Sequence, residues 1–271
     1  MIQLQNLTFE YTDSPRGLDN ISLTIHDGEF MGIMGANGSG KTTLARCLNG
    51  LRLPTAGDVW VDELNTKEPA NLTQIRRRVG MVFQNPENQI VSTTVEREIA
   101  FGLENLGVPH DEMHRIVNEM LAQFDLEKYR QHPPHLLSGG EMQRLALAAV
   151  MAMSPKYLVL DEPTSLLDPP TRKMVLKLIN GIHSKNRERA ERIATILITQ
   201  FPEEALGCDR LLILQRGRIV FDDRPAAIFQ HVDELKSLGV EVPAEYEIDH
   251  FLKRLSDGKF SLNPADFLPI L

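Results

Sequence analysis

The sequence predicts an α/β fold organised around a phosphate-binding loop, and three observations carry that prediction. Residues 35–42 read Gly-Ala-Asn-Gly-Ser-Gly-Lys-Thr, which matches the pattern G-x-x-x-x-G-K-[ST]. An apolar run over 30–34 comes directly before this loop, and apolar residues at helical spacing follow it. Farther along, short apolar runs of strand length alternate with helical patterns, which is typical of a sheet with parallel strands.

Each residue type in this loop suits a bound phosphate. Glycines allow consecutive backbone N–H groups to turn inward and form a concave anion site. Lys41 is a flexible positive charge that can reach the β- and γ-phosphates, and the hydroxyl of Thr42 suits Mg²⁺. The following helix, which Gly50 should end, points its N-terminus at the phosphates. The loop therefore predicts ATP and Mg²⁺ as ligands.

The other elements follow from periodicity. Besides 30–34, strands are expected over 2–9, 21–25, 79–83, 157–160 and 193–198. Tyr11 lies in a polar turn after the first strand, and Gln84 follows the strand over 79–83. From there to about residue 153 the pattern favours helices, and the apolar residues of 111–124 share one helix face.

Two carboxylates, Asp161 and Glu162, follow the apolar strand over 157–160. Open α/β sheets bind ligands at the carboxyl edge of their strands, so these side chains should emerge beside the phosphate-binding loop. Asp161 is then placed to hold Mg²⁺ through water, and Glu162 to polarise an attacking water. A strand end with solvated charges would look the same, but the phosphate-binding loop earlier in the chain favours the functional interpretation.

A second glycine-rich helix start occurs at 137–144, which reads Leu-Ser-Gly-Gly-Glu-Met-Gln-Arg. Ser138 and Glu141 have the spacing of a capping box, so a helix should begin here. A glycine-rich helix N-terminus is also an anion site. Because one nucleotide cannot easily use two such sites so far apart in one chain, the pattern calls for a second copy of the protein.

Composition excludes several classes. The net charge of −8 and a pI near 5.5 argue against a general nucleic-acid surface. The two cysteines lack a C-x-x-C partner, so neither a disulfide framework nor a zinc site is expected, which fits a reducing cytoplasm. The amino terminus has no signal-peptide pattern, and the longest apolar run, 145–153, is shorter than the roughly 20 residues of a membrane span. Any membrane role should therefore require a partner.

On these motifs the sequence resembles the ATP-binding-cassette (ABC) ATPases over nearly all of its first 225 residues. The resemblance implies a P-loop NTPase core with a mixed β-sheet, a helical signature-motif subdomain at about 85–153 and an N-terminal antiparallel β part. An ABC ATPase domain would then span 1–225, and 226–271 would form a short C-terminal helical extension.

The resemblance also implies the role of each motif residue. The ATP-binding residues would be Tyr11, Gly35, Asn37, Gly38, Ser39, Gly40, Lys41, Thr42 and Thr43. The signature residues, which act on the ATP of the partner chain, would be Leu137, Ser138, Gly139, Gly140 and Glu141. Asp168 would contact the partner, Glu162, Gln84 and Gln200 would be catalytic, and Thr42, Gln84 and Asp161 would hold Mg²⁺, Asp161 through water. Each ATP would lie between the two chains of a head-to-tail dimer, which closes on ATP and opens after hydrolysis.

A narrower resemblance rests on 84–90, which reads Gln-Asn-Pro-Glu-Asn-Gln-Ile, and on the tail over 232–255. Both look like the ATPase subunits of energy-coupling factor (ECF) importers, which take up vitamins or transition-metal ions such as cobalt and nickel. The partners implied are a second ABC ATPase, identical or different, a transmembrane coupling subunit and a membrane-embedded substrate-binding subunit, with no nucleic acid. The chain would then lie at the cytoplasmic face of the cell membrane.

Two surfaces follow from this resemblance. Residues 85–107, with a capped helix start at 93–96, should form the groove for cytoplasmic helices of the transmembrane subunit. Its apolar residues, any of which could instead belong to the core, are Ile90, Val91, Ile99 and Phe101. In the tail, Ile248, Phe251, Leu252 and Leu255 form one helical stripe, for which a dimer-stabilising role and simple packing on the domain are both open.

The sequence departs from the family at Gln200. The family usually has threonine, histidine and an acidic residue where this chain has Thr199, Gln200 and Phe201. A glutamine amide can donate to a γ-phosphate oxygen and accept from water, but it cannot carry a positive charge. Since a charge-assisted bond is roughly twice as strong as a neutral one, hydrolysis should slow while ATP binding persists. Either a different partner ATPase supplies the histidine, or Gln200 suffices in a homodimer.

Other functions share these motifs. ABC ATPases of DNA repair carry a long coiled coil or zinc insertion between loop and signature, and translation-associated ones usually carry two cassettes, whereas this chain has neither. A largely non-hydrolytic ATP-binding partner in an ATPase heterodimer would be favoured by loss of Glu162, which is present. We therefore predict an ATP hydrolase that energises an ECF-type importer.

Overall fold

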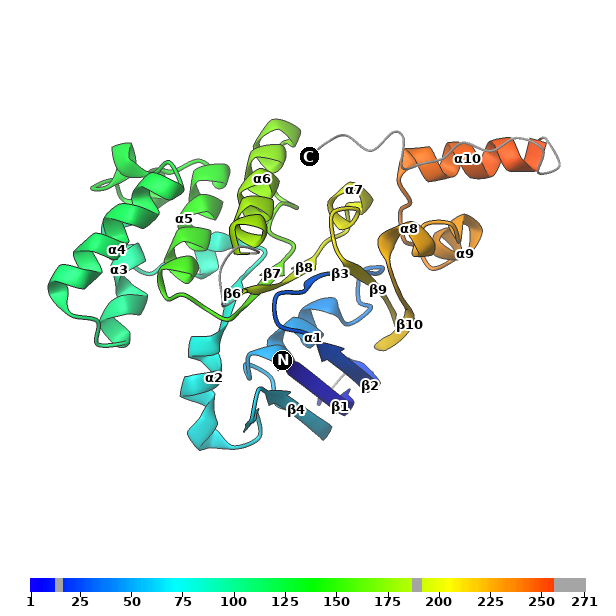
Figure 1. The fold of residues 1–271 in the computed structure, drawn as a ribbon, viewed down its shortest axis with the longest axis horizontal. Coiled ribbons are helices and arrows are strands. Elements are labelled where there is room, and N and C mark those ends of the chain that lie inside the picture. Colours follow the sequence, from blue (N-terminus) through cyan, green and yellow to red (C-terminus); the bar gives the residue numbers. More distant parts are fainter. Residues whose placement is uncertain (13–16, 187–191, 256–271) are drawn as a thin grey trace.

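The computed structural model describes residues 1–12, 17–186 and 192–255 (Figure 1). Its strands are β1 (Ile2–Phe9), β2 (Leu18–Ile25), β3 (Phe30–Met34), β4 (Ala56–Val61), β5 (Leu64–Asn65), β6 (Val79–Val82), β7 (Tyr157–Asp161), β8 (Ala194–Ile198), β9 (Arg210–Gln215) and β10 (Arg218–Asp223). Its α-helices are α1 (Lys41–Leu48), α2 (Leu72–Arg78), α3 (Val95–Asn105), α4 (His110–Gln123), α5 (Gly139–Ala152), α6 (Pro169–Asn186), α7 (Pro202–Ala205), α8 (Pro225–Ile228), α9 (Val232–Ser237) and α10 (Ala244–Leu255).

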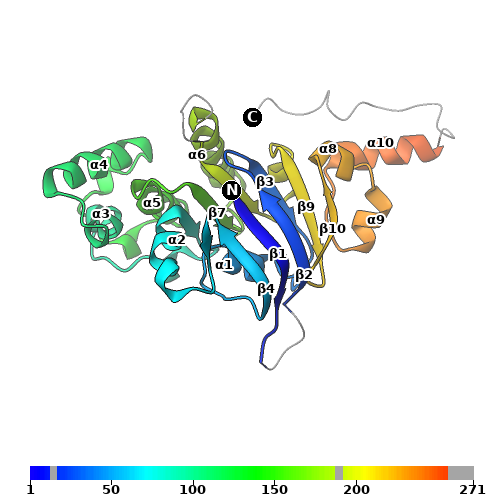
Figure 2. The same ribbon diagram turned by 60° about the horizontal axis from the view of Figure 1, so that its bottom comes forward.

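The strands form two sheets. One has the order β10-β9-β3-β8-β7-β6, in which β10 is antiparallel to β9 and the other strands run parallel. The other is antiparallel, with the order β2-β1-β4-β5, and Figure 2 shows its strands beside the core sheet. The predicted mixed sheet and N-terminal antiparallel part are confirmed. The strand predicted over 21–25 begins earlier, at Leu18, because Leu18 pairs with Phe9 of β1.

Helix α1 lies in the hydrophobic core that joins the two sheets. Its buried residues, including Leu44 and Leu48, share one cluster with β1, β2, β3, β4, β7 and β8. Strand β7 is buried along its whole length, as expected for a central strand covered on both faces. The phosphate-binding loop is therefore held between a fully buried strand, β3, and a buried helix.

A second cluster holds helices α3, α4 and α5 together at one end of the molecule (Figure 1). Thr94 caps α3 by accepting a hydrogen bond from the backbone of Arg97, and Ser138 and Glu141 form the predicted capping box of α5. The predicted amphipathic helix is α4, and its apolar face, including Val117 and Leu121, is buried. In the described part of the chain, no helix combines the length and the apolarity needed to cross a bilayer.

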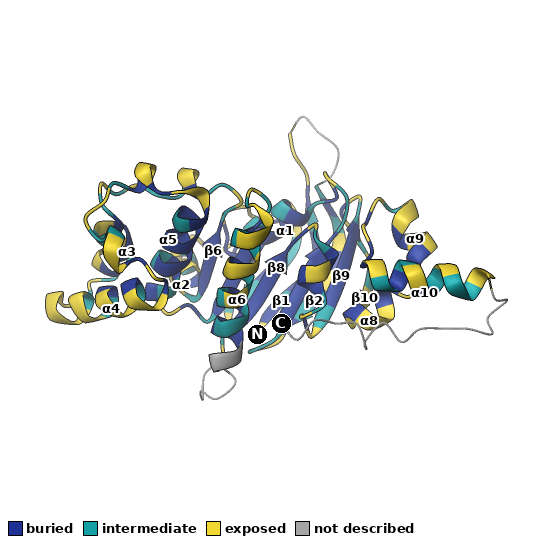
Figure 3. Cartoon of the chain, turned by 90° about the horizontal axis from the view of Figure 1, so that it is seen from above, coloured by how far each residue is buried: buried dark blue, intermediate teal, exposed yellow. Residues whose placement is uncertain are grey.

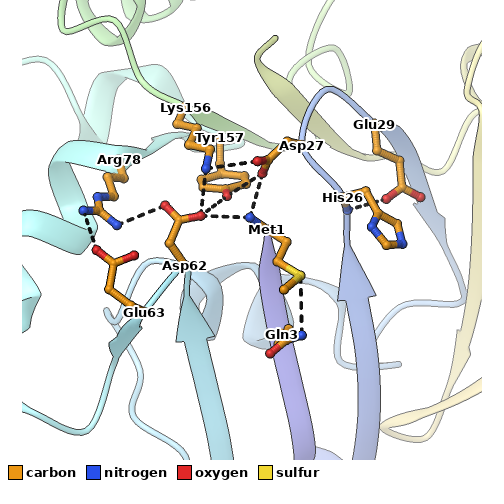
Figure 4. Close-up of polar contacts among 10 residues, drawn as sticks. All are labelled: Met1, Gln3, His26, Asp27, Glu29, Asp62, Glu63, Arg78, Lys156 and Tyr157. Atoms are coloured by element: carbon orange, nitrogen blue, oxygen red, sulfur yellow. Dashed lines mark hydrogen bonds and ion pairs between the residues drawn. The ribbon is translucent and has the colours of Figure 1, made fainter. Parts of the chain in front are cut away.

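An ion-pair cluster joins strand ends of the two sheets (Figure 4). Asp62, after β4, accepts hydrogen bonds from Lys156, the Tyr157 hydroxyl and Arg78 at 2.8, 2.7 and 3.0 Å, and it pairs with the amino group of Met1 at 2.8 Å. Burial alone would raise the pKa of Asp62, but these donors outweigh it and hold that pKa below its usual value.

Helices α8, α9 and α10 lie at the opposite end of the molecule from α3–α5 (Figure 1). Helix α10 packs on α9 through Tyr246, which is buried with Phe229, and Figure 3 shows much of α10 exposed. In the predicted stripe, Ile248, Phe251 and Leu255 are 52%, 60% and 69% exposed. In the single chain these three side chains are therefore largely exposed, and both interpretations of the stripe stay predictions. Residues 256–271 of the predicted extension lie outside the described residues.

Candidate nucleotide site

The site is built at the carboxyl ends of four neighbouring parallel strands. Strand β3 leads into the phosphate-binding loop, β6 precedes Gln84, β7 ends at Asp161 and Glu162, and β8 precedes Thr199 and Gln200. These strands lie in the order β3-β8-β7-β6. The topology thus brings together side chains that lie far apart in the sequence. This agrees with the prediction that residues at the carboxyl ends of the strands emerge beside the phosphate-binding loop.

The phosphate-binding loop has the geometry of an anion cradle. Gly35, Gly38 and Gly40 have φ values of 153°, 77° and 109°, a region that L side chains rarely adopt. A Cβ added at Gly38 would meet nothing within 4 Å, and the buried hydroxyl of Ser39 has no hydrogen-bond partner among the described residues. An open face of backbone and a buried hydroxyl without a partner both fit a phosphate group.

Lys41 lies folded inside this cradle. Its ammonium group donates to the carbonyl oxygens of Gly35 and Ala36 at 2.8 and 3.2 Å, and it is 3.9 Å from Glu162 Oε1. Burial lowers the pKa of Lys41, whereas the Glu162 and Asp161 carboxylates oppose that shift. In this structure the carbonyl oxygens therefore accept hydrogen bonds that the Lys41 ammonium group could instead donate to a phosphate.

Thr42 and Asp161 meet across the site. The Thr42 hydroxyl donates to Asp161 Oδ1 at 3.1 Å, and Asp161 is buried at the end of β7. Burial raises the pKa of Asp161, and Glu162 also raises it, while the Thr42 hydrogen bond lowers it. A buried carboxylate beside a hydroxyl is a set of hard oxygen ligands of the kind that Mg²⁺ prefers, so these residues fit the predicted ion.

Glu162 contacts Gln84. The Gln84 amide donates to Glu162 Oε2 at 3.0 Å and lies 3.3 Å from the Ser165 hydroxyl. Glu162 has φ of 49°, an unusual value for a residue with a side chain. Strained backbone of this kind is found at functional sites, where the surrounding structure holds it in place. The structure therefore places Gln84 against Glu162, but among the described residues no hydrogen bond joins Gln84 to Thr42 or Asp161.

Gln200 lies at the rim of the site and is exposed. With Asn37 and Phe201 it lines a cavity of about 320 Å³ whose opposite wall is formed by 239–241 of the C-terminal extension. A Cβ added at Gly239 would lie 3.5 Å from the Cβ of Ala36. The extension thus reaches the phosphate-binding loop, a contact that was not predicted from the sequence.

Tyr11 and Thr43 lie on the other flank of the loop. The Tyr11 hydroxyl is 2.7 Å from Thr43 Oγ1, and the Tyr11 ring meets Phe9 edge-on at 4.9 Å. The guanidinium of Arg52 lies 5.7 Å from the centre of the Tyr11 ring. Tyr11 is 36% exposed, so part of its ring is accessible for stacking.

The signature residues lie at the N-terminus of α5. Ser138 and Gly139 are exposed, Leu137 and Gly140 are buried, and a Cβ added at Gly140 would clash with Thr171 of α6 at 2.2 Å. Glu141 accepts hydrogen bonds from Tyr129 and Ser138, and the Tyr129 hydroxyl is the main cause that lowers the Glu141 pKa to about 2. Tyr129 was not predicted, and no sequence signal marks it.

Asp168, the predicted dimer contact, is exposed just before α6. Among the described residues, no hydrogen bond or ion pair joins the signature residues or Asp168 to the phosphate-binding loop of the same chain. A single chain therefore presents one nucleotide-facing set of side chains and a separate exposed helix N-terminus.

Comparison with known proteins agrees with this geometry. The family model described as ABC transporter matches residues 18–165. A curated relative from Caldanaerobacter subterraneus, "Energy-coupling factor transporter ATP-binding protein EcfA1", is 43% identical over 258 residues, covering 94% of this chain and 91% of that protein.

Two solved structures share the fold. The structure of cbiO1 from Clostridium perfringens, part of the ABC transporter complex cbiONQ, has a TM-score of 0.77 at 30% identity and covers 93% of this chain and 98% of that chain. A dimeric post-hydrolysis structure of the ATP-binding cassette MJ0796, bound to ADP and Pi, has a TM-score of 0.75 at 28% identity and covers 83% of this chain and 99% of that chain.

Proposed function

This chain belongs to the ATP-binding-cassette (ABC) transporter family as an ATP-hydrolysing subunit of the energy-coupling factor type, and from that premise we propose that it is the motor of an importer for a vitamin or a transition-metal ion. Its ATP cycle drives a transmembrane coupling subunit, which works with a membrane-embedded substrate-binding subunit. The chain acts at the cytoplasmic face of the cell membrane, bound through these partners.

The observation that carries the proposal is the meeting of Gln84, Glu162 and Lys41 at one sheet edge. Lys41 and the loop amides bind the phosphates, and Glu162 polarises the attacking water. Gln84 contacts Glu162 directly, so a displacement of the segment after β6 alters the carboxylate that hydrolysis needs. Gln200, exposed at the rim beside Asn37, orients the γ-phosphate or the water through its amide.

Thr42, Asp161 and Gln84 are the residues that would hold Mg²⁺, with Asp161 acting through water. The ion, when bound, neutralises charge on the β- and γ-phosphates. The 3.1 Å contact between Thr42 and Asp161 supports this assignment. The burial that raises the Asp161 pKa in the protein alone is offset once a cation lies beside the carboxylate.

The chain works as a head-to-tail dimer with a second ABC ATPase. Exposed Ser138, Gly139 and Asp168 are then free to meet the nucleotide and loop of the partner. The C-terminal extension, 226–271, stabilises this dimer through the exposed stripe on α10, while 1–225 forms the ATPase domain with its helical subdomain at about 85–153.

The surface for the coupling subunit lies on 85–107. Two of its four predicted apolar residues, Val91 and Phe101, are 65% and 46% exposed, whereas Ile99 is fully buried in the core. Exposed apolar side chains on this segment are what a docking helix would cover. This arrangement supports transmission from the coupling subunit to Glu162 by way of Gln84.

Two experiments test the proposal. A tag on this chain, followed by detergent extraction of membranes and mass spectrometry, should recover two membrane proteins and either a second ATPase or only this one. Glu162→Gln should lower hydrolysis by about 10²- to 10⁴-fold and leave ATP affinity within a few-fold. Recovery of no membrane protein would refute the importer role, and unchanged hydrolysis in the variant would refute the role of Glu162.

A further inference from the structure

One buried carboxylate near the site has no part in the function proposed so far. Glu204 lies in the short helix α7, directly after the Gln200 segment, and it is only 6% exposed. Its neighbour Glu203 is exposed. Burial of an ionisable side chain is unfavourable unless its oxygens are satisfied, so the contacts of Glu204 indicate what the carboxylate does.

The two oxygens of Glu204 each hold a different loop of the nucleotide site. The Thr164 hydroxyl donates to Oε1 at 2.6 Å, and the Thr199 hydroxyl donates to Oε2 at 2.6 Å. Both threonines are only 1% exposed. These are short O–H···O hydrogen bonds. Burial raises the pKa of Glu204, and the hydrogen bonds from Thr164 and Thr199 oppose that shift.

Each threonine lies within two positions of a residue to which we assign a role in hydrolysis. Thr164 follows Glu162 by two positions, in the loop whose Ser165 contacts Gln84. Thr199 directly precedes Gln200, and its hydroxyl oxygen also accepts the backbone N–H of Phe201 at 3.0 Å. The carboxylate of Glu204 therefore lies between the Glu162 loop and the Gln200 segment and is bonded to both.

A second contact, between Arg172 and Phe201, also holds the Gln200 segment. The guanidinium of Arg172, in α6, lies 3.5 Å from the centre of the Phe201 ring, and its Nη2 donates to the Leu167 carbonyl at 3.3 Å. Cation–π contacts of this kind are favourable, more so when partly desolvated. Phe201 thus connects the segment to the helix that follows Asp168.

We propose that Glu204 is a positioning residue for ATP hydrolysis, which fixes the Gln200 segment relative to the Glu162 loop through Thr199 and Thr164. This rests on the roles proposed above for Glu162 and Gln200. The side chain at this position accepts one hydrogen bond at each of its two oxygens, because the Thr164 and Thr199 hydroxyls both donate to it while the Thr199 oxygen accepts the Phe201 N–H. A carboxylate does so, whereas an amide has only one acceptor oxygen.

The test compares Glu204→Leu and Glu204→Gln with a matched control, Glu203→Gln, in the ATPase complex isolated from membranes. Leucine fills the space without either hydrogen bond, and glutamine retains one acceptor. The rates are compared below the melting temperature of every variant. We expect kcat to fall about 10- to 100-fold in Glu204→Leu, because small misplacements of reacting groups lower rates by such factors. In Glu204→Gln the fall should be smaller. KM for ATP should stay within about twofold, because the phosphate-binding loop is untouched.

A double-mutant cycle adds a readout that a purely structural role would not move. Thr199→Val alone should lower kcat, and the same change in the Glu204→Leu background should add little, since the shared bond is already lost. The proposal is overturned if Glu204→Leu keeps the wild-type kcat per folded molecule, if only KM rises, or if the two effects add fully. Glu162→Gln distinguishes a failure of the proposed site from a failure of the Glu204 proposal. If that variant kept its activity, the proposed site itself would be refuted.

Discussion

The amide nitrogen of Gln84 lies 3.0 Å from a carboxylate oxygen of Glu162, although 78 residues separate them in the sequence. Gln84 follows β6, the edge strand of the parallel part of the sheet, and Glu162 directly follows the neighbouring strand β7. The contact connects the segment that carries exposed Val91 with the carboxylate proposed to activate water. It therefore gives a physical route by which a docked membrane subunit can influence hydrolysis.

Replacing Gln84 should separate coupling from nucleotide binding. In Gln84→Ala, the stimulation of hydrolysis by the assembled transporter should fall by about 5- to 150-fold, the range of typical coupling free energies. ATP affinity should change little, because Lys41 and the loop amides are unaffected. ATPase rates with and without transport substrate, alongside nucleotide titrations, measure both quantities.

The matched control for that experiment is Gln123→Ala, which removes an exposed amide at the end of α4. It should leave both quantities at wild-type values. If Gln84→Ala lowers affinity and stimulation equally, Gln84 belongs to the binding site alone and the coupling role is wrong.

Gln200 should limit the rate of hydrolysis. Gln200→His introduces a side chain that can carry positive charge, and we expect kcat to rise by about 2- to 30-fold, the difference between a neutral and a charge-assisted hydrogen bond. The gain should grow as the pH falls from 8 towards 6, because histidine protonates in that range. A wild-type rate already typical of the family, and unaffected by this substitution, would contradict the prediction and favour a homodimer in which glutamine suffices.

The exposed stripe on α10 should contribute to dimer formation. Phe251 is 60% exposed, so Phe251→Asp should leave the melting temperature of the single chain nearly unchanged while it weakens self-association or association with a partner ATPase. Sedimentation velocity without nucleotide measures the effect. Val220→Asp, at an exposed apolar position of β10, is the control, and equal behaviour of the two variants would argue against the stripe as an interface.

The parallel core and most of the site could be predicted because their signals are local. A buried parallel strand is a continuous apolar run, and the residues at its carboxyl end can be assigned to one edge. Strands β4 and β10 were not predicted, because their residues are only partly buried and it is pairing with β1 and β9 that makes them strands. β9 was also missed, although Leu211 to Leu214 form an apolar run that marks it.

Glu204 shows the limit of prediction for the site. In the sequence, Glu203 and Glu204 look like two solvated charges, and only tertiary packing distinguishes them. Glu204 is buried because the chain places Thr164, 40 residues earlier, against its carboxylate. A contact between hydroxyls and a carboxylate from two separate segments leaves no periodic or motif-like trace in one sequence. The approach of Gly239 to the phosphate-binding loop is hidden for the same reason.

The cluster around Asp62 should make the stability of the fold depend on acid pH. In the folded chain the Asp62 pKa is lowered by Lys156, the Met1 amino group and Tyr157, despite the opposing effect of burial. A carboxylate with a lowered folded-state pKa stabilises the fold above its unfolded pKa, about 3.9, and loses that contribution as the pH falls through the folded value. Asp62→Asn should therefore cost about 1–3 kcal/mol near neutral pH, the usual range for hydrogen bonds to a charged group.

The cost of this substitution should shrink as the pH falls below about 4, because Asp62 of the unfolded chain then binds a proton while the folded chain, with its lowered pKa, still holds the carboxylate ionised. Urea unfolding of both proteins between pH 3 and 7, followed by fluorescence or circular dichroism, measures the difference in their free energies of unfolding. Glu63→Gln is the control, since Glu63 pairs with the same Arg78 but is 70% exposed, and exposed ion pairs contribute little. A constant difference between wild type and Asp62→Asn across this range would show that the ion pairs do not provide the stability, and that packing at the junction of the two sheets does.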